Sequence, residues 1–144
     1  MGLIDPGINL FAAIMKPILI VFTSFILCSF QYQPTLKGTW TYAGDVFNGK
    51  KEGAPKEYAL RRKYDGAHYE AFVVQKGYKD EKYETGNYTL KGDTCIDTET
   101  FSLQPSKIIN KPIHYFYAVR NDTLVLKGVL PFGKPVEEYW KRVR

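Results

Sequence analysis

The segment LKGTW, Leu36 to Trp40, opens the first strand-like stretch of this 144-residue chain. It follows an apolar leader and holds the first of the two tryptophans. Through LKGTWTYA, residues 36–43, large side chains alternate with small or polar ones, which is the period of a strand with one buried face. The segment therefore predicts a strand anchored by Trp40, with Gly38 on the same face leaving room for close packing.

Seven further segments show the same alternation, or a short apolar run between turn signals. Together with 36–43, the predicted strands are 56–64, 68–76, 83–92, 94–103, 113–120, 123–130 and 135–143. Most connections are of hairpin length, and two contain the tight-turn pairs Asp65–Gly66 and Gly92–Asp93.

Sequential hairpins favour an antiparallel meander, and eight strands are enough to close it into a barrel without exposed edges. We therefore expect an all-β fold, an eight-stranded antiparallel up-and-down barrel formed by one domain at 32–144. An open β-sandwich is the alternative, but it needs Greek-key crossovers that the short connections disfavour.

The two ends of the domain support closure. In such a barrel the first and last strands pair antiparallel, so Trp40 and Arg142 would lie at the same rim. A guanidinium over an indole gains about 0.5–2 kcal/mol from cation–π attraction. We assign Gly38, Trp40 and Arg142 to barrel closure, which is a structural role.

The motifs LKGTW, YETGNYTLKGD, RNDTLVLKG and EEYWKRV, taken in this order, resemble those of small secreted bacterial lipocalin-like domains of the calycin superfamily. The resemblance covers residues 36–143 and implies a lipocalin-like barrel, in a family of unknown function. It also implies that GDVFNGKKEGAPKE, residues 44–57, is a loop over the open mouth with a gating or partner-contact role. The chain departs from large lipocalins in lacking a Thr-Asp-Tyr motif and paired cysteines, so animal lipocalin functions are not carried over.

Residues 1–31 have the pattern of a signal peptide or an N-terminal anchor. From Met15, an alternative start, one lysine precedes the apolar run 18–27, and small or polar residues follow. The run is shorter than the ~20 residues of a membrane span. Leu27 fits poorly before a lipidated cysteine, which disfavours a lipoprotein through Cys28. We expect a secreted, periplasmic or envelope protein that contacts a membrane only if this segment is uncleaved or lipidated.

Composition and residue types weigh against several functions. The formal charge of +5 is a mild excess and not a nucleic-acid signature. Cys28 and Cys95 make neither a disulfide framework nor a zinc site. His68 and His114 fall on separate strands, and Glu137 and Glu138 would point to opposite faces. With neither a Gly-x-Ser-x-Gly nor a P-loop motif present, we expect no enzyme, cofactor, metal or nucleic-acid partner.

The barrel lumen is the default pocket of this fold, and we expect it to hold a small apolar or amphipathic ligand. Strand parity gives these candidate lining residues: Tyr42, Tyr58, Leu60, Arg62, Phe72, Tyr88, Tyr115, Tyr117 and Leu126. An inward Arg62 needs a partner, either Glu138 or a ligand carboxylate, because an unpaired buried charge is costly. A cavity of about 300 Å³ or more would favour ligand binding. The alternative is a packed barrel without ligand that serves as an envelope interaction module.

Overall fold

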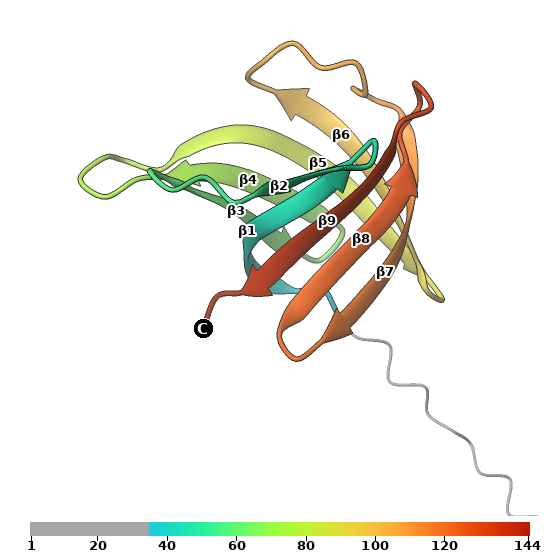
Figure 1. Ribbon diagram of the computed structural model, residues 1–144, viewed down its shortest axis with the longest axis horizontal. Helices are drawn as coiled ribbons and strands as arrows, with labels where there is room; N and C mark the ends of the chain where they lie inside the picture. The colour runs from blue at the N-terminus through green and yellow to red at the C-terminus, as the bar shows by residue number, and fades with distance from the viewer. Residues whose placement is uncertain (1–34) are drawn as a thin grey trace, which may run out of the picture. The chain divides into compact units, whose positions relative to one another are not determined.

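A computed structural model describes residues 35–144, and the interpretations of residues 1–31 lie outside this part of the chain. The described residues form these nine strands: β1 Gly38–Phe47, β2 Lys50–Gly53, β3 Ala59–Asp65, β4 His68–Val74, β5 Glu81–Lys91, β6 Thr94–Ser102, β7 Pro112–Arg120, β8 Thr123–Val129 and β9 Pro135–Arg142 (Figure 1). The described residues contain no helix that is both long and apolar enough to cross a membrane.

Eight of these strands close into a barrel. The strand order is β2-β1-β3-β4-β5-β6-β7-β8-β9, and β1 also pairs with β9. All pairings are antiparallel, so β1 and β3 to β9 form a closed up-and-down meander with β2 added beside β1. The all-β barrel predicted from the alternation is confirmed, and the open sandwich is excluded. A closed up-and-down barrel is also the architecture that the sequence resemblance implied.

The segment predicted as a loop at 44–57 begins as a hairpin, so that prediction was wrong. Strand β1 continues to Phe47, turns at Asn48 and Gly49, and returns as β2 to Gly53. Gly44 makes the tight pairing possible, because its φ is +133° and an added Cβ would lie 2.6 Å from the carbonyl oxygen of Glu52. All four residues of β2 are exposed, and so the sequence there lacks the alternation that marks a half-buried strand.

One end of the barrel is packed shut around Trp40. Trp40 and Leu36 are fully buried, and the indole Nε1 of Trp40 donates a hydrogen bond of 2.8 Å to the carbonyl oxygen of Leu36. The guanidinium of Arg142 lies 4.1 Å from the Trp40 ring centroid and donates to the carbonyl oxygen of Lys37 at 3.1 Å. An added Cβ at Gly38 would lie 3.1 Å from Nη1 of Arg142. These contacts join the first strand to the last.

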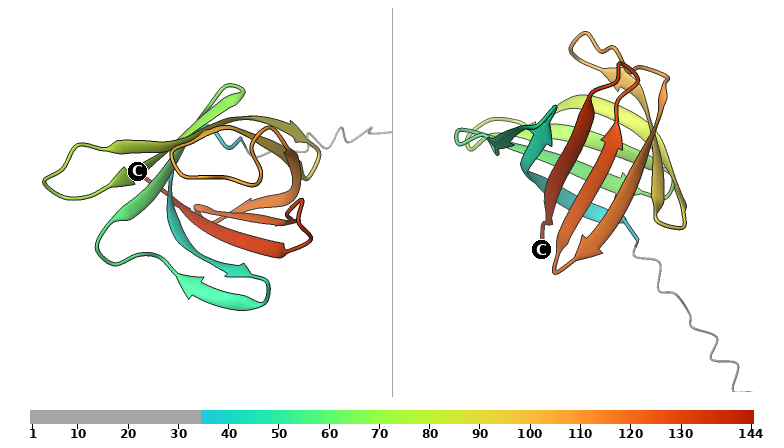
Figure 2. Two further views of the ribbon diagram at one scale, coloured as in Figure 1. Left: turned by 90° about the horizontal axis from the view of Figure 1, so that it is seen from above. Right: turned by 45° about the vertical axis from the view of Figure 1, so that its right-hand side comes forward.

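The connections at the other end of the barrel include the β1–β2 turn, residues 103–111 between β6 and β7, and residues 130–134 between β8 and β9. Seen from above, residues 103–111 arch over this end (Figure 2). Their position is held by the amide of Asn110, which donates to the carbonyl oxygen of Glu99 at 2.7 Å, and Ile108 packs against the core. We call this end the mouth.

Gly86 provides a test of the packing between β4, β5 and β6. It is buried, and an added Cβ would clash with the Tyr69 ring and lie 2.5 Å from the carbonyl oxygen of Thr98. Because the backbone of a paired strand yields little, we expect Gly86→Ala to lower the free energy of unfolding by about 1–3 kcal/mol in urea denaturation. Gly53→Ala is the control, since an added Cβ there meets nothing within 4 Å. Equal urea denaturation midpoints for Gly86→Ala and Gly53→Ala would contradict this packing.

Candidate functional site

A cavity of about 200 Å³ lies in the mouth half of the barrel. Its apolar residues are Phe47, Tyr69, Ile108, Ile113, Tyr115, Leu130 and Val136, and its charged residues are Asp45, Arg62, Glu84, Asp97, Glu99 and Glu138. The volume is below the ~300–1,000 Å³ usual for ligand pockets. It is therefore also below the ~300 Å³ that we expected to favour ligand binding over a packed barrel. The cavity therefore suits only a small molecule.

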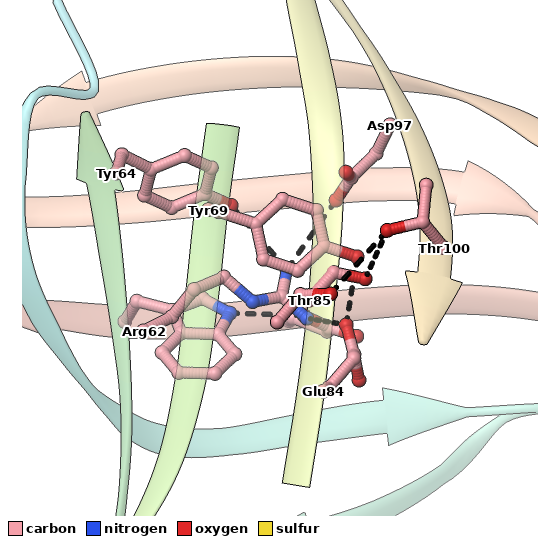
Figure 3. A network of polar contacts seen from close by, with 9 residues as sticks. Arg62, Tyr64, Tyr69, Glu84, Thr85, Asp97 and Thr100 are labelled. Carbon is pink, nitrogen blue, oxygen red and sulfur yellow. Dashed lines mark hydrogen bonds and ion pairs between the residues drawn. The ribbon is translucent and has the colours of Figure 1, made fainter. Parts of the chain in front are cut away.

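Arg62 on β3 is the only cation among the lining residues, and it is 7% exposed. Its Nη2 lies 3.1 Å from Oε1 of Glu84, and its Nη1 lies 3.4 Å from Oδ2 of Asp97 and 3.3 Å from the Tyr64 hydroxyl oxygen (Figure 3). The Tyr69 hydroxyl donates to the same Glu84 oxygen at 2.8 Å. Charge-assisted hydrogen bonds of this kind are what allow a guanidinium to be buried.

Two aromatic rings also contact the Arg62 guanidinium. Its central carbon lies 4.7 Å from the Tyr69 ring centroid and 4.9 Å from that of Trp140. Although burial opposes its charge, Tyr64 and the carboxylate of Glu84 act in the opposite sense, and the pKa of Arg62 is raised well above its usual value. Arg62 is therefore a fixed positive charge in the barrel interior.

The sequence predicted Glu138 or a ligand carboxylate as the partner of Arg62, but the ion pairs are made with Glu84 and Asp97. Glu138 instead accepts a hydrogen bond of 2.9 Å from Nε1 of Trp140. It lies opposite Asp45 in the β1–β9 register, so both carboxylates line the cavity from neighbouring strands.

The cavity holds five carboxyl groups for one guanidinium. Among residues 35–144, the fully buried carboxyl oxygens that lack a hydrogen-bond partner are Oδ1 of Asp45, Oδ1 of Asp97 and Oε1 of Glu99. Burial raises the pKa of Asp97 to about 7, with Arg62 opposing and Glu84 adding to the rise. Burial also raises the pKa of Glu99. The interior is therefore acidic and incompletely satisfied.

The raised pKa of Asp97 predicts that stability falls as pH rises. The folded protein keeps this proton up to about pH 7, whereas an unfolded Asp loses it near pH ~4. Between these values the folded state binds more protons, so the free energy of unfolding decreases with pH. The free energy of unfolding of the wild type should therefore fall between pH 5 and pH 8. We expect Asp97→Asn to reduce this fall by roughly 2–3 kcal/mol, as measured by urea denaturation.

The control for this profile is Asp65→Asn, because the Asp65 side chain is 68% exposed. The neighbours that face Asp97 are Arg62 from β3, Glu84 from β5 and Glu138 from β9. They are unchanged in both variants, so a slope shared by Asp97→Asn and the wild type would contradict the raised pKa.

Of the nine predicted lining residues, Arg62 and Tyr115 line the cavity. The side chains of Tyr88, Tyr117 and Leu126 are buried in the core cluster, where Tyr88 packs edge-on against Tyr64 at 4.9 Å between ring centroids. Tyr42 packs against Trp140 at 5.3 Å between centroids, and Leu60 is half-buried.

Two predicted lining residues, Tyr58 and Phe72, were placed wrongly. Tyr58 precedes β3 and is 42% exposed. On β4 the buried residues are Tyr69 and Ala71, so Phe72 has the opposite parity; it lines an outer depression with Arg61 and lies 5.8 Å from Nζ of Lys82. The run EAFVV is apolar at both parities, and alternation alone therefore leaves the inward face undecided.

The sequence analysis also missed the acidic residues Asp45, Glu84, Asp97 and Glu99. In TCIDTETF, residues 94–101, Asp97 and Glu99 share parity with buried Cys95. That shared parity was a usable signal, but acidic residues in a strand are usually solvent-facing.

The comparisons with known proteins leave the family open. No family model matches the chain, and no curated protein matches it. Two solved structures of substitution mutants of the fluorescent protein UnaG align with 15% and 14% identity. They cover 75% and 76% of this chain and 96% of their own chains, with a TM-score of 0.39 each. At this identity and score the likeness supports no functional argument, and the site is interpreted from its own geometry.

Proposed function

We propose that this protein binds a small amphipathic molecule in its barrel lumen and has no catalytic role. The observation that supports this most directly is a cavity whose interior presents buried carboxyl oxygens without partners. The leader pattern at 15–31 supports a location outside the cytoplasm, where the barrel would capture or carry its ligand.

The distribution of side chains in the cavity matches an amphipathic ligand. Phe47 and Leu130 lie at or beside the ends of strands at the mouth, and Ile108 lies in the connection between β6 and β7; all three provide apolar contacts. The charged groups of Arg62 and Asp97 lie deeper, next to the packed end. A molecule with a polar head and a short apolar body would satisfy both regions.

The alternative of a packed interaction module explains the interior less well. A barrel that needs only to fold gains stability from apolar side chains, whereas buried polar atoms without partners cost free energy. Asp97 and Glu99 are 4% and 5% exposed and each keeps one unpartnered oxygen. A lumen that binds a polar group provides a reason for keeping these side chains there.

Native mass spectrometry of the protein isolated from its natural source tests this proposal. We expect a wild-type population carrying a small non-covalent adduct that is lost in Val136→Trp, because Val136 is buried at the cavity and a larger ring fills it. Val129→Trp is the matched control, since Val129 is 61% exposed on the neighbouring strand. A wild type without adduct, or an adduct retained equally in both variants, would contradict lumen binding.

A further inference from the structure

Resting on this proposed function, we infer that the polar head of the ligand is a cation: the lumen takes a small protonated organic amine with a short apolar body. The inference comes from the charges that line the cavity, from the hydrogen-bonding groups left free there, and from the position of Arg62.

The charges that line the cavity favour a cation. Five carboxyl groups, from β1, β5, β6 and β9, face one guanidinium. Arg62 offsets part of this charge through Glu84 and Asp97, while Asp45, Glu99 and Glu138 lie outside its two ion pairs. At pH 8, above the raised pKa of Asp97, this excess of carboxylates attracts a cation and repels an anion.

Arg62 offers few accessible hydrogen-bond donors to an anionic ligand. Its two terminal nitrogens already contact Glu84, Asp97 and the Tyr64 hydroxyl. Its Nε has no hydrogen-bond partner in the described chain, but it is fully buried. A ligand carboxylate would have to displace one of these carboxylates to reach the guanidinium. This weakens the hypothesis, drawn from the sequence, that Arg62 pairs with a ligand carboxylate.

The unpartnered acceptors in the cavity match the hydrogen-bond donors of an ammonium group. Asp97 Oδ1 and Glu99 Oε1 belong to side chains that are more than nine-tenths buried, and both lack a partner within the described chain. Asp45, a half-buried residue on the opposite wall, adds a third buried oxygen without a partner, its Oδ1. An ionised carboxylate only accepts hydrogen bonds, whereas an ammonium group has three N–H donors and no acceptor.

The arrangement of the carboxyl groups favours an organic cation over a metal ion. Between residues 35 and 144, no three His, Cys, Asp or Glu side chains converge in a way that could hold a metal. The acidic groups are instead spread around a space of about 200 Å³ with an apolar mouth. Such a space suits an ammonium head with a small hydrocarbon body.

Isothermal titration calorimetry with three probes of matched size tests the inference: phenethylamine, 2-phenylethanol and 3-phenylpropanoate, which are cationic, neutral and anionic. At pH 8 and low salt we expect the full-length protein to bind phenethylamine about tenfold or more tightly than the alcohol. We expect the anion to bind more weakly than both. Calcium chloride, as a fourth titrant, is expected to leave phenethylamine binding unchanged.

Substitutions of single carboxylates test which residues produce the preference for the amine. Glu99→Gln should reduce the preference for the amine over the alcohol several-fold, and Asp45→Asn provides a second, independent test if Glu99→Gln melts below the assay temperature. The control is Glu70→Gln, because Glu70 forms an outer-surface ion pair with Lys82 and its side chain is 42% exposed. That variant should keep the wild-type preference.

The outcomes distinguish this inference from the proposed function. An alcohol or anion that binds as tightly as the amine overturns the inference and leaves lumen binding standing. The same holds if calcium displaces phenethylamine, or if Glu70→Gln lowers the amine preference as much as Glu99→Gln. Failure of every probe to bind at millimolar concentration overturns both proposals.

Discussion

Arg62→Met is expected to lower the free energy of unfolding by about 3–5 kcal/mol at pH 8, because it leaves buried carboxylates without their cation. Arg62 pairs with Glu84 and Asp97, whose side chains are 16% and 6% exposed. The variant also removes the contacts of the guanidinium with the rings of Tyr69 and Trp140. Urea denaturation followed by tryptophan fluorescence measures the change.

The same variant should be partly rescued by acid. Without Arg62, which opposes the effect of burial, the pKa of Asp97 rises further. Asp97 then holds its proton at pH 5, where its desolvation costs less than at pH 8. We therefore expect the loss at pH 5 to be clearly smaller than the loss at pH 8. Lys63→Met is the control, since Lys63 is exposed on the same strand. An Arg62→Met loss that matches Lys63→Met, or that is the same at both pH values, would refute the charge argument.

Trp40→Ala is the second variant with a large expected effect, a loss of about 3–5 kcal/mol in the free energy of unfolding. The side chain is fully buried, its Nε1 donates to Leu36, and its ring lies under Arg142. Truncation leaves a cavity at the seam where β1 meets β9 and removes all of these contacts at once. Thermal and urea denaturation both measure the loss.

A matched variant separates packing from hydrogen bonding at this seam. Trp40→Phe keeps an aromatic ring near Arg142 but removes the hydrogen bond to Leu36. We expect its loss to be smaller than that of Trp40→Ala. A Trp40→Ala protein with the melting temperature of the wild type would show that Trp40 has no role in closing the barrel.

The fold was predictable because most strands have one buried face. Eight strands and their order followed from alternation and from turn pairs such as Asp65–Gly66, and the barrel is confirmed by the β1–β9 pairing. Strand β2 was missed because it is exposed on every residue and has no alternation to detect. The location outside the cytoplasm and the absence of catalysis are still predictions.

The candidate site was predictable only in part. Arg62 shares parity with Leu60 in a strand of mixed character, and that was enough to place it inward. The prediction of the inner face of β4 was wrong at Phe72, because apolar residues occur on both faces of this strand. The acidic lining was missed for a different reason. Asp97 pairs with a cation three strands away, and although its parity with Cys95 was visible, a single sequence contains no signal for that pairing.

The most direct test of the account is where a cationic probe binds. Titration of ¹⁵N-labelled protein with phenethylamine, followed by amide chemical shifts, reports this residue by residue. We expect the largest shifts at Asp97, Glu99, Tyr115 and Val136, which line the cavity on three strands. Largest shifts on the outer depression around Phe72, or no saturable shifts at all, would contradict the claim that the barrel lumen is the binding site.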